Sequence, residues 1–455
     1  MEKTIAAIST APAPGGIGIV RISGGEAFAV AEKVFRGVSG KKVSQMKGYT
    51  AQLGGAYTPG GEKLDDVVAL VYRGPKSYTG EDVVELSCHG GLYMTKRLLQ
   101  LVLDAGAAPA GPGEFTRRAF LNGKMDLAQA EAVMGLISAS GEQARKAALA
   151  GSTGVLSRKI ESIKQGLLEQ AAHLAAWADF PEEDVPQVEE AALLEGIRQG
   201  EKALEELLQG FDRGRMYREG LVTVIAGRPN AGKSTLMNLL SGCQRSIVTQ
   251  YAGTTRDVVE ETVMVAGVPL RLADTAGIRD TDDPVESIGV QAARQRLETA
   301  QLVLAVFDSS QALEKEDWEL MDALEKVPAI AIVNKSDLPT QMDVEAIQKR
   351  FEKTVSLSAA TGEGLAALEQ ALSEILDTKD FHPQEGVLFT QRQRMDAQTA
   401  LDSLREGEQA LVLGLTLDAV TVCVEDALHA LAALTGEQVS EEIVDRVFEE
   451  FCVGK

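Results

Sequence analysis

A glycine-rich octapeptide, GRPNAGKS at residues 227–234, constrains the fold of this chain more than any other stretch. It follows an apolar run typical of a buried strand and precedes a run typical of a helix start. In that setting Gly227 and Gly232 let backbone N–H groups and a helix N-terminus face phosphate oxygens. We expect Lys233 to act as a catalytic cation at the β- and γ-phosphates, and the Ser234 hydroxyl to bind Mg²⁺. The octapeptide therefore predicts an α/β P-loop domain.

Four further motifs follow the octapeptide in a fixed order, each beside a predicted strand: GTTRD at 253–257, DTAG at 274–277, NKSD at 334–337 and SAA at 358–360. The Asp337 carboxylate can accept from N1–H and the exocyclic amine of guanine, whereas adenine has no donor at N1. The nucleotide is therefore predicted to be GTP, with Thr255 completing the Mg²⁺ shell. The predicted GTP contacts are Asn230, Ala231, Gly232, Lys233, Ser234, Thr235, Thr249, Thr254, Thr255, Asp274, Thr275, Ala276, Gly277, Asn334, Lys335, Asp337, Ser358, Ala359 and Ala360.

The residue after DTAG is Ile278, where Ras-like GTPases carry a glutamine that orients the attacking water. Two polar candidates remain for the catalytic step. Asn230, with oxygen atoms from the segment 249–254, is predicted to hold a monovalent cation that supplies positive charge beside the phosphates. Glu286 is predicted to orient the water, and its alternative role is that of a solvated acid at a helix start. The predicted ligands of this monovalent cation are Asn230, Thr249, Tyr251 and Thr254.

Composition limits the setting in which the chain works. The four cysteines are scattered without metal or disulfide spacing, and no apolar run reaches the length of a membrane span, so we expect a cytoplasmic protein without membrane contact. The net charge of −22 opposes broad binding to a polyanion. Any RNA contact must then be local or shared with a basic partner, and the cations available for a local patch are Arg117, Arg118, Lys124, Arg213 and Arg215.

The chain order predicts a multidomain protein. Strand-like and helix-like runs alternate over residues 1–118, which indicates an α+β domain. Helical periodicity covers 119–215 and returns over 379–455, on both sides of the α/β GTPase module at 216–378. The simplest architecture is one discontinuous all-α domain with the P-loop GTPase domain inserted into it.

Two cysteine-containing stretches admit a functional and a structural interpretation. Cys88 and His89 could be metal ligands, or one of them a nucleophile. No second His or Cys lies nearby, so we favour the structural interpretation, in which these residues form a turn at a strand end. Cys452, three residues before the C-terminal Lys455, is either part of a frayed tail or a reactive thiol beside a cation. Lipidation is rejected because the ending CVGK is not a prenylation signal.

Besides the inserted GTPase module, six short stretches form a distinctive set: RISG at 21–24, SYTGED at 77–82, CHGG at 88–91, PGEFT at 112–116, RAFLNGK at 118–124 and FCVGK at 451–455. With these stretches the chain resembles the MnmE (TrmE) family of tRNA-modification GTPases essentially from end to end. A departure is Gly111, where the family commonly has arginine.

The resemblance implies a homodimer formed through the N-terminal domain and a flavoprotein partner, MnmG (GidA), which carries FAD and NADH. It implies addition of an aminomethyl or carboxymethylaminomethyl group at carbon 5 of the tRNA wobble uridine. The one-carbon unit comes from a tetrahydrofolate derivative, in the 5-formyl or methylene form, bound by the N-terminal domain. The residues implied at the folate are Arg21, Glu85, Lys124 and Lys455. The resemblance also implies potassium at Asn230 and a water-assisting role for Glu286.

Two other functional classes share parts of this pattern. A switch GTPase of ribosome assembly has the same five GTPase motifs, but usually adds an RNA-binding domain and a basic surface, neither of which is evident here. A folate enzyme with an ancillary GTPase requires acid and base residues near the folate that the sequence does not visibly provide. We therefore favour a GTP-hydrolysing component of a two-protein tRNA-modifying enzyme.

Overall fold

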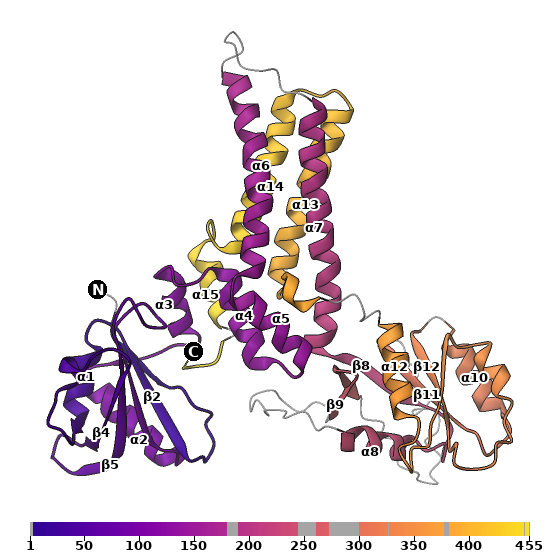
Figure 1. Cartoon of the computed structure of the whole chain (residues 1–455), viewed down its shortest axis with the longest axis horizontal. Coiled ribbons are helices and arrows are strands. Elements are labelled where there is room, and N and C mark those ends of the chain that lie inside the picture. The colour runs from indigo at the N-terminus through magenta and orange to yellow at the C-terminus, as the bar shows by residue number, and fades with distance from the viewer. Residues whose placement is uncertain are drawn as a thin grey trace. The chain divides into compact units, whose positions relative to one another are not determined.

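The computed structural model describes residues 3–179, 190–243, 261–272, 300–325, 327–376, 382–449 and 451–454. Two compact units make up the chain (Figure 1). The first contains residues 1–134, 160–186 and 414–455, and the second contains residues 135–159 and 187–413. The predicted multidomain class, with α+β, helical and α/β parts, is confirmed.

The first unit is built on a seven-stranded sheet of order β3-β4-β5-β6-β2-β1-β7. Neighbouring strands are antiparallel except β1 and β7, which are parallel. The strands are β1 (Ile5–Ile8), β2 (Ile17–Ser23), β3 (Phe35–Gly37), β4 (Thr50–Tyr57), β5 (Lys63–Tyr72), β6 (Val83–His89) and β7 (Ala108–Pro109).

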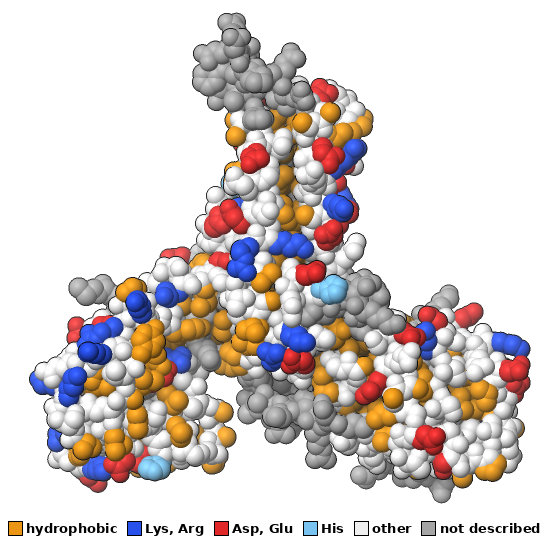
Figure 2. Space-filling model, viewed as in Figure 1, with side chains coloured by type: hydrophobic (Ala, Val, Ile, Leu, Met, Phe, Trp, Pro, Cys, Tyr) orange, Lys and Arg blue, Asp and Glu red, His pale blue; other side chains and the backbone are white. Residues whose placement is uncertain are grey.

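Helices α1 (Ala27–Val34) and α2 (Leu92–Asp104) cover one face of this sheet and close its core. Alternation along β2 sends Val20 and Ile22 into that core, while Ile19 and Arg21 point to the other face. On the other face Leu53 and Val68 lie opposite each other and are 58% and 38% exposed. Figure 2 shows hydrophobic side chains gathered over the strands of this domain. This part of the sheet therefore exposes apolar side chains on the face opposite α1 and α2.

The helices of the first unit pack against the C-terminal end of the chain. Leu127 and Ala130 of α4 are buried against Phe448 and Phe451. Nearby, the buried Lys164 ammonium donates to both oxygens of Glu437 at 2.7 Å. The elements concerned are α3 (Glu114–Leu121), α4 (Leu127–Ser138), α6 (Val155–Asp179), α14 (Leu417–Thr435) and α15 (Glu441–Glu449), of which α4 and α6 also extend into the second unit.

The second unit contains a six-stranded sheet of order β13-β12-β11-β8-β10-β9. All neighbours are parallel except β9 and β10, and every residue of β11 and β12 is buried, as expected for central parallel strands. The strands are β8 (Leu221–Ala226), β9 (Glu261–Val265), β10 (Val268–Leu272), β11 (Leu302–Asp308), β12 (Ala329–Asn334) and β13 (Lys353–Ser356). The helices are α8 (Lys233–Cys243), α10 (Lys315–Ala323), α11 (Val344–Gln348) and α12 (Leu365–Ile375).

Long helices precede and follow this sheet in the second unit. Helices α7 (Glu190–Glu219) and α13 (Gln391–Val412) lie side by side, joined by ion pairs between Arg198 and Glu408 at 2.7 Å and between Arg405 and Glu205 at 2.6 Å. The remaining elements are α5 (Glu142–Ser152) and the short 3-10 helices η1 (Val43–Gln45), in the first unit, and η3 (Pro383–Glu385). Within the described residues, no helix combines the length and the apolar character needed to cross a membrane.

Candidate functional site

The phosphate-binding loop joins β8 to α8, as the octapeptide predicts. Gly227 and Gly232 have φ angles of +155° and +98°, a region that glycine enters without penalty. A Cβ at Gly227 would collide with the Val306 carbonyl, and one at Gly232 with the Asn334 side-chain amide. The two glycines are therefore required by backbone conformation and by close approach to β11 and β12.

Polar groups of the loop are arranged for an anion with its metal. The Lys233 ammonium donates to the carbonyl oxygens of Gly227 at 2.8 Å and Arg228 at 2.7 Å, which holds it across the loop. Ser234 and Thr235 are exposed in the first turn of α8, so their hydroxyls are accessible to a ligand. Asn230 is also exposed and has a φ of +61°.

Asn334 brings three of the predicted motifs together at the ends of parallel strands. Its side chain is buried, donates to the Ala231 carbonyl at 2.8 Å and accepts from the Ala359 N–H at 3.0 Å. Asp337, three residues after Asn334, is exposed. Ser358, the first residue of SAA, is fully buried. The structure therefore assembles the phosphate loop, NKSD and SAA into one site.

Asp308, at the end of β11, is a residue of this site that sequence reasoning missed. Its carboxylate accepts from the Lys335 ammonium at 2.6 Å and from the Ser310 hydroxyl at 2.6 Å. Burial alone would raise the pKa of Asp308, but the hydrogen bonds from Lys335 and Ser310 outweigh it, so the pKa is lowered. The sequence did contain one signal for this residue, which is an acidic residue at the end of an otherwise apolar strand.

Several predicted residues of the hydrolysis and metal sites lie outside the described residues. They are Thr249, Tyr251, Thr254, Thr255, Asp274, Thr275, Ala276, Gly277, Ile278 and Glu286. The same holds for Lys455 at the predicted folate site.

A second polar site lies on the face of the N-terminal sheet opposite α1 and α2. Arg21 of β2 stands opposite Glu85 of β6, and its Nε donates to Oε1 at 2.9 Å. The guanidinium also lies 5.8 Å from the Tyr78 ring centroid and 5.5 Å from that of Phe115. Burial raises the pKa of Tyr78, so its phenol stays neutral at physiological pH. A charged pair flanked by aromatic rings suits a flat ligand with polar edges.

The C-terminal tail reaches this second site. Val453 forms a β-bridge with Pro112, and the Gly113 N–H donates to the Cys452 carbonyl at 3.3 Å. The Gly454 carbonyl accepts from the Ser9 hydroxyl at 3.2 Å and from Arg21 at 3.4 Å. Of the two interpretations of the tail, the frayed end is therefore wrong for residues 451–454, because the tail is docked beside Arg21.

Lys124 is placed differently from Arg21 and the tail. Its ammonium donates to the Pro75 carbonyl at 3.0 Å and its stem lies near Gly80. The structure thus joins Arg21, Glu85 and the tail directly, whereas Lys124, which follows α3, contacts the loop between β5 and β6.

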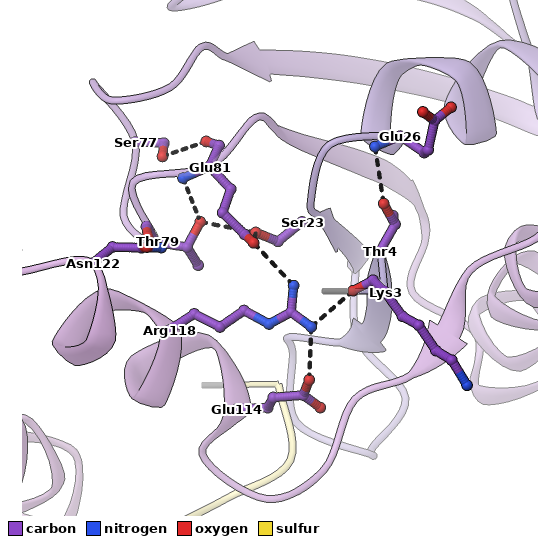
Figure 3. Close-up of polar contacts among 10 residues, drawn as sticks. All are labelled: Lys3, Thr4, Ser23, Glu26, Ser77, Thr79, Glu81, Glu114, Arg118 and Asn122. Atoms are coloured by element: carbon purple, nitrogen blue, oxygen red, sulfur yellow. Dashed lines mark hydrogen bonds and ion pairs between the residues drawn. The ribbon is translucent and has the colours of Figure 1, made fainter. Parts of the chain in front are cut away.

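Arg118 is the centre of a buried network that fixes the same loop (Figure 3). Its guanidinium donates to Glu81 at 3.1 Å, to Glu114 at 2.9 Å and to the Lys3 carbonyl at 2.8 Å. Glu81 also accepts from the Ser23 hydroxyl at 2.6 Å. Arg118 is only 4% exposed, so it is unavailable to RNA, contrary to its inclusion among the candidate cations.

Cys88 and His89 have structural partners. Cys88 is buried with its thiol near the Gly18 carbonyl, and burial raises the pKa of that thiol, which disfavours the nucleophilic thiolate. His89 ends β6 and its Nδ1 lies 2.7 Å from Asp65. His89 lies at a strand end, as predicted. Among the described residues there is no group of three side chains that could hold a metal ion.

Comparisons with known proteins cover the whole chain. The family model described as MnmE helical domain matches residues 127–452, and the model described as GTP-binding protein TrmE N-terminus matches residues 4–124. The tRNA modification GTPase MnmE of Symbiobacterium thermophilum is 45% identical over 457 residues, with 100% of both chains covered. The protein of the same name from Alkaliphilus oremlandii is 42% identical over 459 residues, again with 100% of both chains covered.

Solved structures match over a smaller part. Aquifex aeolicus Era, solved with GDP and AlF4⁻, is 27% identical with a TM-score of 0.28, covering 42% of this chain and 67% of that one. The G domain of the Thermotoga maritima FeoB iron transporter is 26% identical with a TM-score of 0.26, covering 34% of this chain and 98% of that one. The full-length relatives and the two family models show that this chain belongs to the MnmE (TrmE) family of tRNA modification GTPases.

Proposed function

We propose that this protein is the potassium-stimulated, GTP-hydrolysing component of a complex that modifies carbon 5 of the tRNA wobble uridine. The group added is aminomethyl or carboxymethylaminomethyl, its one-carbon unit comes from a tetrahydrofolate, and the flavoprotein MnmG (GidA) with FAD and NADH is the partner. We place it in the cytoplasm with its tRNA substrate. The observation that carries the proposal is that one chain holds both a nucleotide site joined by Asn334 and an Arg21–Glu85 site capped by its own C-terminus.

The donor set of the phosphate loop fits a magnesium nucleotide. Lys233 binds the phosphates, the Ser234 hydroxyl and Thr255 bind Mg²⁺, and Asp337 selects guanine by accepting two hydrogen bonds. Magnesium supplies charge neutralisation between the β- and γ-phosphates. Ala359 and Ala360 follow the buried Ser358 and are proposed to border the base, with the Ala359 N–H itself donating to the Asn334 side chain at 3.0 Å.

The potassium proposal rests on the exposed Asn230 side chain, which the loop backbone presents at the phosphate site. We expect Asn230→Ala to abolish stimulation by K⁺ while leaving nucleotide affinity largely intact. Initial GTPase rates in KCl and NaCl at equal ionic strength give the measurement, and equal rates for the unmutated protein refute the cation site.

Glu286 is proposed to orient the attacking water in place of the glutamine that Ile278 replaces. We expect Glu286→Ala to lower turnover by about 100-fold, the scale of general base catalysis, without weakening GDP binding. Undiminished turnover in single-turnover assays would make Glu286 a solvated acid.

The folate proposal rests on the chemistry of the second site. A pterin presents adjacent N–H donors that a carboxylate such as Glu85 accepts, and the rings of Tyr78 and Phe115 flank the guanidinium of Arg21. Lys455 and Lys124 are proposed to meet the negatively charged glutamate tail. Calorimetry with 5-formyltetrahydrofolate tests this: we expect Glu85→Gln to weaken binding by about tenfold or more, the scale of one charged hydrogen bond.

A matched variant controls the folate experiment. Glu62 is an exposed carboxylate in the turn between β4 and β5, so Glu62→Gln makes the same change away from the site. Equal affinity of Glu85→Gln and Glu62→Gln for the folate would reject the assigned site.

The homodimer is proposed to form through the open sheet face that carries Leu53 and Val68. Burying such apolar surface against a second copy removes it from water and stabilises association. We expect Val68→Asp to shift the protein to a monomer in light scattering, whereas Leu149→Asp, an exposed position on α5, leaves the dimer intact. A monomeric unmutated protein at micromolar concentration would contradict this proposal.

Charge favours the N-terminal domain as the part that contacts tRNA. Residues 1–124 contain 15 Lys and Arg against 11 Asp and Glu, although the whole chain has a net charge of −22. Of the predicted cations there, Lys124 is exposed, whereas Arg117 pairs with Asp445 at 2.9 Å. Outside it, Arg215 pairs with Glu219 at 2.7 Å, and the Arg213 side chain lies outside the described residues.

The decisive test is mass spectrometry of tRNA nucleosides from cells with and without this gene. We expect the carbon-5-substituted wobble uridines of the aminomethyl type to disappear and to return on complementation. An unchanged nucleoside profile would reject the modification function and favour a ribosome-assembly GTPase.

A further inference from the structure

One ten-residue segment, residues 308–317, touches both loops of the nucleotide site although it belongs to none of the nucleotide motifs. It connects the end of β11 to the first turn of α10. At its start it is bonded to NKSD, and at its end it is bonded to the phosphate loop.

The start of the segment forms three hydrogen bonds with the NKSD loop at residues 334–337, which we call the base-recognition loop. The Asp308 carboxylate accepts from the Lys335 ammonium at 2.6 Å. Ser309 donates its N–H to the Asn334 carbonyl at 3.0 Å and its hydroxyl to the Lys335 carbonyl at 3.0 Å. Asp308 and Ser309 are both buried, and Lys335 has a φ of +61°. These bonds fix an uncommon backbone conformation two residues before Asp337.

The end of the segment is fastened to the phosphate loop through Arg228. The guanidinium contacts Asp317 at 2.9 Å through Nε and Glu314 at 2.7 Å through Nη1. Asp317 is 2% exposed and also accepts from the Glu314 N–H at 3.0 Å. Glu314 is largely exposed, so screening by water leaves Asp317 as the stronger partner. The Arg228 carbonyl, in turn, accepts from Lys233 at 2.7 Å.

From these contacts we infer that the segment 308–317 is a positioning element that holds the phosphate loop and the base-recognition loop in register. Arg228, Asp317 and Asp308 are its positioning residues, and none of them is assigned a contact with nucleotide. The direct bond from Asn334 to Ala231 is a separate link between the same loops. The inference rests on the proposed nucleotide site and adds to it the residues that preorganise it.

The first test is nucleotide affinity, measured by titrating the full-length protein with a fluorescent GDP analogue in the presence of Mg²⁺. Arg228→Gln and Asp317→Asn each remove the charged hydrogen bond between Arg228 and the buried Asp317. We therefore expect each substitution to raise the Kd for the GDP analogue by about tenfold. Because the element acts on binding, KM for GTP rises similarly while kcat stays within about threefold. Combining the two substitutions adds no more than about twofold, since both remove the same contact.

A control on the same helix separates positioning from general destabilisation. Arg350 pairs with Asp322 of α10 at 2.9 Å on the surface, so Arg350→Met removes another ion pair of the same helix. We expect its Kd and KM to match the unmutated protein. If Arg228→Gln lowers the unfolding midpoint but leaves Kd unchanged, the element is merely structural and the inference fails.

The second test is coupling between the two ends of the segment. If one element positions both loops, Arg228→Gln and Asp308→Asn are non-additive, and the effect of one on Kd changes by about threefold or more in the presence of the other. Additive effects overturn the inference, because they indicate two independent ion pairs. Lys233→Ala tests the site itself: if that variant binds GDP normally, the assigned nucleotide site is wrong whatever the other variants do.

Discussion

Docking of the C-terminal tail depends on Gly454, and replacing that residue with alanine should release it. Gly454 has a φ of +98°, and an added Cβ would collide with the Ile8 carbonyl oxygen and lie 3.1 Å from Ser9 Cα. The left-handed conformation alone costs alanine about 1–2 kcal/mol. The collision involves backbone, so no side-chain rotation can relieve it, and the tail must move.

The contacts that hold the tail are of similar strength to this penalty. Gly454 accepts two hydrogen bonds, from Ser9 at 3.2 Å and Arg21 at 3.4 Å, and Cys452 accepts one at 3.3 Å. Each is worth roughly 0.5–1.5 kcal/mol in water. A penalty of about 2 kcal/mol therefore raises the open population by about 30-fold.

The assay is alkylation of Cys452 by iodoacetamide in the full-length protein, followed by peptide mass spectrometry. Cys423 is half-buried on α14 and serves as the internal reference. We expect Gly454→Ala to raise the labelling ratio of Cys452 to Cys423 by about tenfold or more, in proportion to the open population.

The matched control is Gly414→Ala, between α13 and α14. Gly414 has a φ of +69° with nothing within 4 Å of an added Cβ, so it carries the backbone penalty without the collision. An unchanged labelling ratio in Gly454→Ala, or an equal rise in Gly414→Ala, would refute the docking argument.

Three other substitutions test separate parts of the chain. Gly232→Ala places a Cβ against the Asn334 amide, so we expect calorimetry to show GDP affinity reduced by about tenfold or more, and normal affinity would contradict this. Arg118→Met leaves the Glu81 carboxylate without its cation, so we expect urea unfolding to show a free energy of unfolding lower by about 3 kcal/mol, which Arg118→Lys does not restore. An unchanged unfolding midpoint would show that the network does not stabilise the fold. The Lys164 hydrogen bond holds the pKa of Glu437 below its usual 4.5, so its stabilising effect is present above that pH and is lost as pH falls. The stability difference between the unmutated protein and Glu437→Gln should therefore be present at pH 7 and shrink below about pH 4.5, and a pH-independent difference would exclude this titration.

The GTPase part was largely predictable because its signals are local. Strand, glycine loop and helix follow one another within about 25 residues, and NKSD and SAA lie where the parallel strands β12 and β13 end. The carboxyl ends of neighbouring parallel strands meet at one edge, so motif order alone predicts that Asn334 lies near Ala231. What motif order does not reveal is Asp308, because a single acid after an apolar strand has no distinctive spacing.

The N-terminal site required more than local sequence. The family resemblance named Arg21 and Glu85, but their contact depends on the antiparallel register of β2 and β6. The sequence also left Arg118 among the surface cations, because a lone arginine on a helix does not reveal its burial. Glu114 lies one turn earlier on the same helix, but only the packing of α3 against the loop between β5 and β6 brings Glu81 to the guanidinium.

The sequence by itself therefore determined the fold classes, the guanine nucleotide and the family, because those follow from residue types at short, fixed spacings. The tertiary structure decided which distant residues meet: Gly454 reaches Arg21 across 433 positions of the chain, and Arg228 reaches Asp317 through a helix start outside every motif. Such contacts arise from sheet register and helix packing, which join segments that no short-range pattern connects.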